Sequence, residues 1–330
     1  MHDLAVLYEH PLWQEPLFAA LDARGVDYVR VDLKRAAYSS DGSPPARVVF
    51  NQASPSAYVR GHVRAVPHAL AYMRHLERLG CRVLNGAAAF SMELSKAAQV
   101  ALCRQLHIDH PRSVVFNDVE AAIAETTSWP RLLKPDLGGS GARIEVVESA
   151  DELRAAFASD AIWAPDNLFL LQEYLPHDPE HGIIRLEILG GELLYPMRVV
   201  THGRFNLCPS PVCNPGEGDD ASVCEVPVVA AAPVEFHPFP EVPAEAVATA
   251  KAILAASSID VGGVEYLETP DGRRVFYDVN ANSNLRPSVA AHFGIAPFER
   301  VVDFLVAACE SARARANSDR EPNGGATQAP

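Results

Sequence analysis

The first ninety residues alternate between short apolar runs and segments whose apolar positions have helical spacing. Four apolar runs of strand length are present: Leu4–Tyr8, Tyr28–Leu33, Arg47–Asn51 and Arg82–Asn85. Between them, Pro16–Arg24 predicts a short helix that ends at Gly25, and Ser56–Leu79 predicts a longer helix with an interruption at Pro67. This alternation is typical of an α/β layer, and its sheet is expected to be parallel.

A second unit begins with the helical pattern of residues 90–107, FSMELSKAAQVALCRQLH. The strand Ser113–Phe116 follows, and Asp118 is placed to cap the next helix. Three later segments have the pattern of two strands joined at a glycine turn: residues 131–148, 183–201 and 261–281. Each of them is expected to form an antiparallel hairpin.

The remaining C-terminal sequence predicts two helices and two segments of unusual composition. The helices are expected at Ala244–Ser257 and Pro297–Ala314. The Pro-rich stretch Cys208–Pro243 is long enough to be a functional loop or a flexible insertion. The final residues, SDREPNGGATQAP, contain no Leu, Ile, Val or aromatic residue, so a disordered tail is expected.

Composition and charge exclude several classes of protein. The chain has 330 residues, 48% of them hydrophobic and 21% charged, which suits a globular protein of roughly two domains. With 28 basic and 42 acidic residues the net charge is −14, so a general nucleic-acid or anionic-membrane binder is not expected. No apolar run of about 18 residues and no secretory signal pattern is present, so a cytoplasmic protein is expected.

A lysine and a glycine-rich segment lie together in the first hairpin. Lys134 is followed closely by four small residues: Gly138, Gly139, Ser140 and Gly141. Their amide groups can approach an anion without hindrance from large side chains, which predicts a phosphate-binding loop. The alternative is a tight turn beside an incidental lysine. The segment is not a P-loop, and no G-x-G-x-x-G opens a helix of the first ninety residues.

The third hairpin carries three oxygen ligands: Glu265, Asp278 and Asn280. Asp278 and Asn280 are two residues apart and share one face of their strand, where Glu265 can join them from the partner strand. Such donors suit Mg²⁺, which commonly takes one or two carboxylates and completes its shell with water and phosphates. The alternative is a solvated strand face, but the surrounding residues are mostly apolar, and buried carboxylates need a partner or a metal.

Several other residues carry weaker signals when taken alone. Lys96, in a helix of apolar and small residues, could contact a phosphate or extend to the surface. Arg185 and Arg198, on the two arms of the second hairpin, could hold a carboxylate or a developing oxyanion, or pair at the surface. The six cysteines show no paired framework, so reduced thiols are expected, and a zinc site in the Pro-rich stretch has little support. The cysteines of that stretch are Cys208, Cys213 and Cys224.

The order of these features resembles the ATP-grasp superfamily of carboxylate–amine ligases. The resemblance covers residues 85–290 and rests on five features in a fixed order. They are a lysine in a helix, a lysine in a strand with a glycine loop after it, a strand end, a hairpin that carries arginines, and the hairpin with the three oxygen ligands. The segments LNGAAAFSMELSK and GGVEYLETPDGRRVFYDVNANSN look most like RimK-type glutamate ligases and glutathione synthetase relatives. The resemblance implies a mixed α/β ATP-grasp fold with an N-terminal Rossmann-like α/β domain.

The resemblance also implies a division of the chain. Residues 1–88 would form the N-terminal α/β domain, and residues 89–170 the central lid domain with the glycine loop. Residues 171–312 would form the C-terminal domain with the metal site, followed by a disordered tail at 313–330. In the N-terminal domain, Asn51, Ser54 and Arg60 are expected to help bind a substrate.

A nucleotide site follows from the same resemblance. Lys96 and Lys134 would contact the phosphates of ATP, with Lys134 also near the adenine, while the Gly138–Gly141 loop would close over the phosphates. The adenine would lie against the end of the strand before the second hairpin, chiefly against backbone groups of Glu173 and Leu175. This strand end consists of Gln172, Glu173, Tyr174 and Leu175.

Metal and reaction sites are implied as well. The three oxygen ligands of the third hairpin would hold two Mg²⁺ ions, with Mn²⁺ as an alternative. Arg198 and Asn206 would lie near an acyl-phosphate, and Arg185 matches a hairpin arginine of the relatives. Asp278 replaces the glutamate of many members, which keeps the charge. The acid expected to hold the ribose is absent just before Arg185, which leaves Asp178 or Glu180 as substitutes.

The implied activity is the ATP-dependent joining of a small-molecule carboxylate to an amine, such as an amino acid or a peptide, through an acyl-phosphate. The segment RFNLCPSPVCNPGEGDD and the Pro-rich residues after it lengthen the region that lines the acceptor site, so an unusual acceptor pocket is expected. Two alternatives are a non-catalytic ATP-binding regulator and a phosphotransferase on the same fold. The sequence leaves open whether the protein forms a homo-oligomer.

Overall fold

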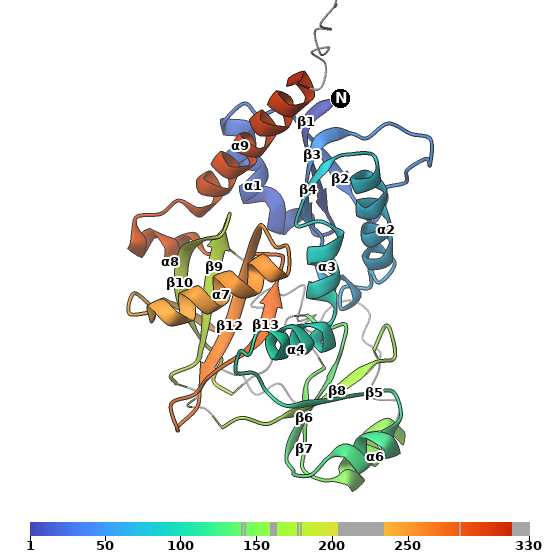
Figure 1. The fold of residues 1–330 in the computed structure, drawn as a ribbon, viewed down its shortest axis with the longest axis vertical. Helices are drawn as coiled ribbons and strands as arrows, with labels where there is room; N and C mark the ends of the chain where they lie inside the picture. The colour runs from blue at the N-terminus through green and yellow to red at the C-terminus, as the bar shows by residue number, and fades with distance from the viewer. Residues whose placement is uncertain are drawn as a thin grey trace, which may run out of the picture.

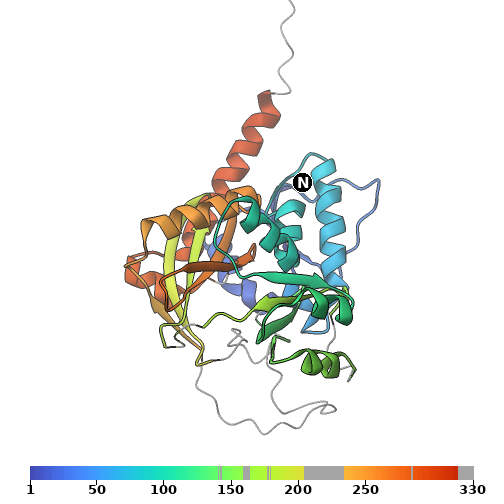
Figure 2. The same cartoon turned by 60° about the horizontal axis from the view of Figure 1, so that its bottom comes forward.

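The computed structural model describes residues 1–139, 141, 143–158, 164–176, 178, 180–203, 234–283 and 285–318. Within these ranges the chain forms three sheets (Figure 1). The N-terminal layer is blue, the small lid sheet is green, and the C-terminal sheet runs from yellow to orange. Figure 2 shows the C-terminal sheet and the lid sheet side by side, with the last helix extending away from both.

The N-terminal layer is a parallel sheet, as predicted. Its strands lie in the order β2-β1-β3-β4, and their bounds are β1 (His2–Tyr8), β2 (Tyr28–Asp32), β3 (Ala46–Gln52) and β4 (Arg82–Leu84). Alternate β1 residues pack on opposite faces, Leu4 toward α1 (Pro11–Ala23) and α9 (Pro297–Ser318), and Ala5 toward α2 (Ala65–Arg78) and α3 (Ala87–Leu94). Burial on both faces explains why these strands are continuous apolar runs.

Two helical patterns are divided differently from the prediction. The Ser56–Leu79 pattern contains a 3₁₀ turn, η1 (Pro55–Tyr58), and then α2, so the break precedes Pro67. Pro67 lies in the first turn of α2, where a missing backbone N–H costs no hydrogen bond. The 90–107 pattern is broken at Ser95, whose hydroxyl accepts the amide of Ala98 at 3.0 Å and caps α4 (Lys96–Gln105). Lys96 is therefore the first residue of a helix.

The lid sheet is antiparallel and small. Its order is β5-β8-β6-β7, with β5 (Ser113–Phe116), β8 (Phe169–Glu173), β6 (Arg131–Pro135) and β7 (Glu145–Val147). The predicted pairing of residues 131–148 is confirmed, and the carboxylate of Asp118 caps α5 (Val119–Glu125) through the amide of Ala121. With α6 (Ala150–Ala158), α5 packs on the sheet around Leu133 and Leu171.

The C-terminal sheet contains the other two predicted hairpins. Its order is β11-β10-β9-β12-β13, all antiparallel, with β9 (Ile183–Leu189), β10 (Glu192–Val200), β11 (Glu235–Pro238), β12 (Val261–Glu268) and β13 (Arg274–Asn280). β11 lies within the Pro-rich stretch and was not predicted. α7 (Ala244–Ala256) covers one face, and α8 (Pro287–Ala290) with the 3₁₀ turn η2 (Ala291–Phe293) lies beyond the other.

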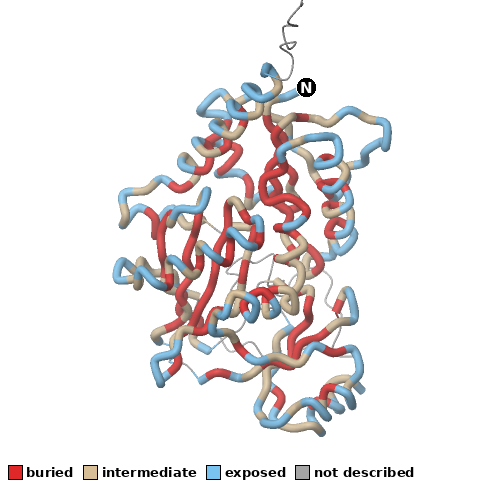
Figure 3. Tube along the Cα trace, viewed as in Figure 1, coloured by how far each residue is buried: buried red, intermediate tan, exposed pale blue. Residues whose placement is uncertain are grey.

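The last helix belongs to the N-terminal core. Val302, Leu305 and Cys309 of α9 pack with the α1 side of the parallel sheet. α9 continues to Ser318, so residues 313–318, which were expected to belong to a disordered tail, are helical. Residues 319–330 lie outside the described ranges. Figure 3 shows that buried positions concentrate in the N-terminal and C-terminal sheets, whereas much of the lid is exposed. No helix in the described ranges is both long and apolar enough to cross a membrane.

One buried side chain joins the N-terminal layer to the C-terminal sheet. Asn85, fully buried after β4, accepts the amides of Asp260 and Val261 at 2.9 and 3.0 Å. Its amide group donates to the carbonyl of Val261 at 2.7 Å and to that of Ala281. Its φ of 51° lies in the left-handed region that asparagine tolerates. The four hydrogen bonds fix the distance between the two layers.

Replacing Asn85 with glycine is therefore expected to lower the free energy of unfolding by about 2–4 kcal/mol, because several buried backbone groups lose their partners. Glycine keeps the left-handed backbone conformation, so the loss reports on the side chain. Chemical denaturation measures it. Asn117→Gly, at an exposed position before α5, should cost much less, and equal losses in both variants would contradict the assigned role.

Candidate active site

A cavity of about 170 Å³ lies where the N-terminal layer, the glycine loop and the C-terminal sheet meet. It is smaller than the roughly 300–1,000 Å³ of sites that hold a whole drug-sized ligand. Eight of the predicted site residues line it: Lys96, Gly138, Gly139, Gly141, Arg185, Glu265, Asp278 and Asn280.

A row of side chains crosses the C-terminal sheet on the face that lines the cavity. Met197 pairs with Arg185, Arg185 with Glu265, and Glu265 with Asp278, each on the next strand. Because neighbouring strands lie about 4.8 Å apart, the apolar side chain of Met197 lies directly beside the charged side chain of Arg185. Asn280 joins the row from two residues along β13 and donates to Asp278 at 2.9 Å. The predicted convergence of the three oxygen ligands is thus present.

Cations neutralise both carboxylates of this set. Lys96 donates to Asp278, and Arg185 donates to Glu265 at 2.8 Å. Burial alone would raise the pKa of Asp278, but Lys96 and Asn280 outweigh it and hold that pKa below its ordinary value. Burial and the nearby charge of Asp278 raise the pKa of Glu265. The two carboxyl groups therefore differ: the pKa of Asp278 lies below its ordinary value and the pKa of Glu265 above it.

The donor set fits Mg²⁺ better than a transition metal. Among the described residues, no group of three or more His, Cys, Asp or Glu side chains could hold a metal ion. Glu265, Asp278 and Asn280 offer two carboxylates and one amide oxygen, a set that suits an ion whose other ligands are water and phosphate.

Lys134 is buried beside this set without lining the cavity. Its side chain is only 7% exposed, and burial together with the charge of Lys96 lowers its pKa to about 8. Asp136, which the sequence analysis did not identify, accepts the amide of Ala97 at 2.6 Å at the start of α4. Its position two residues after Lys134 is the only sequence signal for it. The two lysines thus converge from different elements with few fixed partners.

The glycine loop rests against the N-terminal layer. A Cβ on Gly139 would come within 2.8–3.1 Å of the Cβ, amide nitrogen and Cα of Ser56, so only glycine permits this approach. The loop therefore closes one side of the cavity. Ser140 lies outside the described residues.

Arg185 is fixed by two carboxylates. Its Nε donates to Glu187 at 2.6 Å, and Glu187 also accepts the hydroxyl of Ser283. Burial lowers the pKa of Arg185, but the two glutamates outweigh this effect and raise it, so the side chain remains a cation. Glu187 and Tyr277, which donates to Glu265 at 2.9 Å, were missed by the sequence analysis. The i, i+2 spacing of Arg185 and Glu187 was an available signal.

The structure does not bring Arg198 to the cavity. Met197 and Val199 line it, so the side chain between them lies on the opposite face of β10, where its partner Ile184 packs against the α7 side. The Nε of Arg198 is buried there without a hydrogen-bond partner among the described residues. Asn206 lies outside the described residues, as do the cysteines of the zinc alternative. The other three cysteines are free thiols: Cys81, Cys103 and Cys309.

The predicted adenine segment ends β8, away from the cavity lining. The amide of Glu173 donates to the carbonyl of Arg112 at 2.7 Å, so this N–H is not available to a base. Gln172 is buried inside the lid sheet, and Tyr174 is exposed. Leu175 packs against Leu267 and Val275 of the C-terminal hairpin. None of the four predicted residues is among the described residues that line the cavity.

Two acidic residues, Glu180 of the predicted set and Glu93 outside it, differ in their relation to the cavity. Glu180 is 77% exposed and faces His202 at 3.5 Å, and it does not line the cavity. Glu93 of α3 does line it and was missed. Burial raises the pKa of Glu93 to about 8, so it is mostly protonated at neutral pH, and its Oε2 has no hydrogen-bond partner in the described structure.

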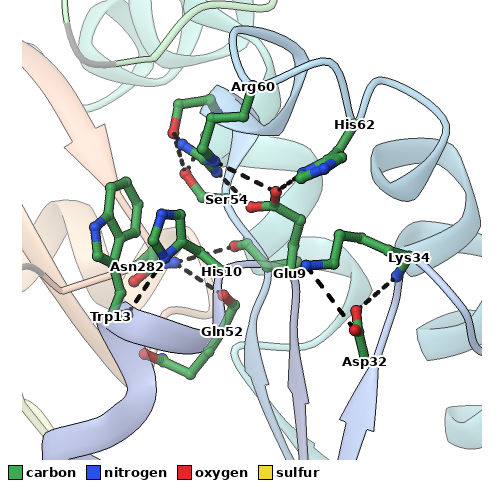
Figure 4. Close-up of polar contacts among 12 residues, drawn as sticks. Glu9, His10, Trp13, Asp32, Lys34, Gln52, Ser54, Arg60, His62 and Asn282 are labelled. Atoms are coloured by element: carbon green, nitrogen blue, oxygen red, sulfur yellow. Dashed lines mark hydrogen bonds and ion pairs between the residues drawn. The ribbon is translucent and has the colours of Figure 1, made fainter. Parts of the chain in front are cut away.

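A second polar cluster supports the N-terminal wall of the cavity (Figure 4). Glu9 lies between Arg60 and His62, and Arg60 donates to Ser56 at 2.9 Å. Burial would raise the pKa of Glu9, but Arg60 and His62 hold it below its ordinary value. Of the residues expected to bind a substrate here, Ser54 lines the cavity, whereas Arg60 is engaged by Glu9 and supports the wall.

These three layers have the architecture of the ATP-grasp fold. A RimK domain ATP-grasp protein from Sphaerobacter thermophilus is 21% identical, covers 91% of this chain and 98% of its own, and has a TM-score of 0.63. The ATP-grasp ligase PsnB, solved with a phosphomimetic precursor variant, Mg and ADP, is 19% identical over 94% and 100%, with a TM-score of 0.64.

A D-alanine–D-alanine ligase from Bacillus anthracis is 15% identical over 96% of this chain and 99% of its own, with a TM-score of 0.65. No protein-family model matches the chain, and no curated protein matches it significantly. The ATP-grasp resemblance of the sequence is thus confirmed for the fold.

The buried Lys134 should cost stability in the protein without nucleotide. Because its pKa in the fold is near 8 and its ordinary value is 10.5, the stability associated with the neutral amine is complete above pH 10.5 and lost as the pH falls toward 8. Lys134→Met should therefore stabilise the protein at pH 7 by up to roughly 3 kcal/mol, with a smaller gain at pH 10. Denaturation at both pH values measures this difference.

Lys251→Met provides the matched control, because Lys251 lies on α7 and pairs with Glu192 at the surface. It should change stability little at either pH. A Lys134→Met gain that is the same at pH 7 and pH 10 would show that the lysine carries no burial penalty.

Proposed function

We propose that this protein is an ATP-dependent ligase that activates a carboxylate as an acyl-phosphate and joins it to an amine. The observation that carries the proposal is the row Arg185–Glu265–Asp278, which meets Lys96 and the glycine loop in one cavity. Phosphoryl transfer to a carboxylate needs groups that bind phosphate, oxygen ligands for a metal ion and a cation held in a fixed position. The fold shared with the three solved structures above, two of which are ligases, supports the same class.

Each part of the cavity has a role in this proposal. Lys96 and Lys134 bind phosphate oxygens, and the glycine amides of residues 138–141 close over them. Glu265, Asp278 and Asn280 would hold Mg²⁺, which when bound neutralises charge on the phosphates. Arg185, held by Glu187 and Glu265, presents a cation beside the reacting groups and stabilises negative charge that develops there.

The reaction proceeds in two steps. A carboxylate oxygen attacks the γ-phosphorus while the bond to ADP breaks, and the amine then attacks the acyl carbon, loses a proton and displaces phosphate. Gly139 lies close against Ser56, and closure of the glycine loop over the bound nucleotide would exclude water and so protect an acyl-phosphate from hydrolysis. The substrates in this proposal are a small carboxylate and an amine, ATP is consumed, and the reaction takes place in the cytoplasm.

The test is ADP and phosphate release by the purified protein with Mg-ATP and a pooled mixture of amino acids and dipeptides. Mass spectrometry should find a product lighter than its two parts by one water. Tight Mg-ATP binding without substrate-dependent ADP release from any pool would favour a nucleotide-binding regulator instead.

Asp278→Asn should lower this ADP release at least about 100-fold, because it removes one negative ligand and the partner of Lys96. Circular dichroism should show an unchanged fold. Asp271→Asn is the matched control, since Asp271 lies in the exposed turn of the same hairpin and should leave turnover unchanged. Normal turnover in a folded Asp278→Asn variant would contradict the proposal that Asp278 binds a metal ion.

A further inference from the structure

The cavity has a charged part and an apolar part. Its charged lining side chains all come from α3, α4 and the C-terminal sheet: Glu93, Lys96, Arg185, Glu265 and Asp278. The N-terminal layer and α9 contribute no charged lining side chain. Eleven apolar residues line much of the rest: Trp13, Leu17, Phe50, Pro55, Met197, Val199, Phe236, Val261, Leu285, Phe298 and Val301. Uncharged polar residues line it as well: Gln14, Gln52, Ser54, Ser56, Asn282 and Ser283.

The two parts are separated along the sheet. On β12, Glu265 marks the charged part, and Val261, four residues earlier on the same face, lies about 13 Å away at the apolar floor. Across the sheet, Met197 follows Arg185 on the next strand, and Val199 pairs with Phe236 beyond it. Apolar surface therefore begins directly beside Arg185, on the side opposite the oxygen ligands.

Two aromatic residues of the apolar part are held rigidly. The ring of Trp13 stacks on His10 at 4.4 Å, and the guanidinium of Arg60 lies 4.6 Å from its centre. Figure 4 shows this arrangement beside the Glu9 cluster. The guanidinium of Arg286 lies 4.0 Å from the centre of Phe236. Cation–π contacts of this kind fix the rings in place, which favours binding of a flat or branched apolar group.

Each charged side chain that is described in the cavity lining either has a role in the proposed function or is mostly neutral. Lys96, Glu265 and Asp278 serve the phosphates and the metal in the proposed function, and Arg185 is compensated by Glu187 and Glu265. Glu93 is mostly protonated at neutral pH. A charged substrate side chain in the apolar part would be buried without a partner, which is unfavourable.

We infer that one of the two substrates carries an apolar side chain, as leucine or phenylalanine does, bound between α1, β10 and α9 with its reacting end directed toward the charged part of the cavity. This rests on the proposed function for the identity of the reacting groups, but the binding of the apolar side chain stands on the cavity alone. Among the described lining residues, a glutamate or lysine side chain would find no free partner of opposite charge in the apolar part.

The experiment is calorimetric titration of the full chain, held with Mg²⁺ and a non-hydrolysable ATP analogue. The probes are leucine, phenylalanine, glutamate and lysine, with Leu-Leu and Glu-Glu as dipeptides. At least one apolar probe should bind at least tenfold more tightly than the charged ones. Trp13→Ala and Phe236→Ala, both at partly exposed positions, should each weaken that binding about tenfold or more.

Two neighbours serve as matched controls. Leu12→Ala changes a 59% exposed residue next to Trp13, and His237→Ala changes the neighbour of Phe236 on β11, and neither residue lines the cavity. Both should bind the apolar probe as the parent does. The inference is overturned if a charged probe binds at least as tightly as the apolar ones, if the cavity variants bind like the controls, or if no probe binds.

Parallel ADP release separates this inference from the proposed function. Apolar binding that is sensitive to Trp13 and Phe236 but gives no ADP with any partner amine or carboxylate would support the apolar pocket and contradict the ligase. ADP release that depends only on glutamate would support the ligase and overturn the apolar pocket.

Discussion

Mutual compensation of buried charges is the constraint on which the cavity face of the C-terminal sheet and its contact with α4 depend. Arg185 is held by Glu187 and Glu265 from the C-terminal sheet, and Lys96, at the start of α4, neutralises Asp278. Each of these charges would be costly to bury alone, so the elements that carry them must stay together. The same pairing makes ligand binding an exchange of partners, because phosphates would compete for the lysine and a divalent cation for the carboxylate.

The N-terminal layer depends on both ends of the chain. Its parallel sheet is covered on one face by α1 and α9, which are separated by more than 270 residues. Asn85 then fixes this layer to β12 and β13 through buried backbone groups. The wall that contains Trp13 therefore keeps a constant position relative to Arg185. A rigid distance between the wall and the reacting groups favours selection among substrates by side chain.

Local patterns predicted most of the secondary structure because they depend on neighbours in sequence. The three hairpins and the Asp118 cap are present where turns and capping residues indicated them. The break at Ser95 and the strand β11 were not predicted. Ser95 caps α4 in a segment that is helical by composition, and β11 gains its hydrogen bonds only from pairing with β10.

For the site, the sequence by itself determined that Glu265, Asp278 and Asn280 share one face of a hairpin, since the turn and a two-residue spacing place them there. The ATP-grasp resemblance of the fold could also be read from it. Only the tertiary structure decided that Arg185 faces the cavity while Arg198 faces α7, and that burial raises the pKa of Glu93. Strand register and burial fix these properties, and both depend on contacts between residues distant in sequence.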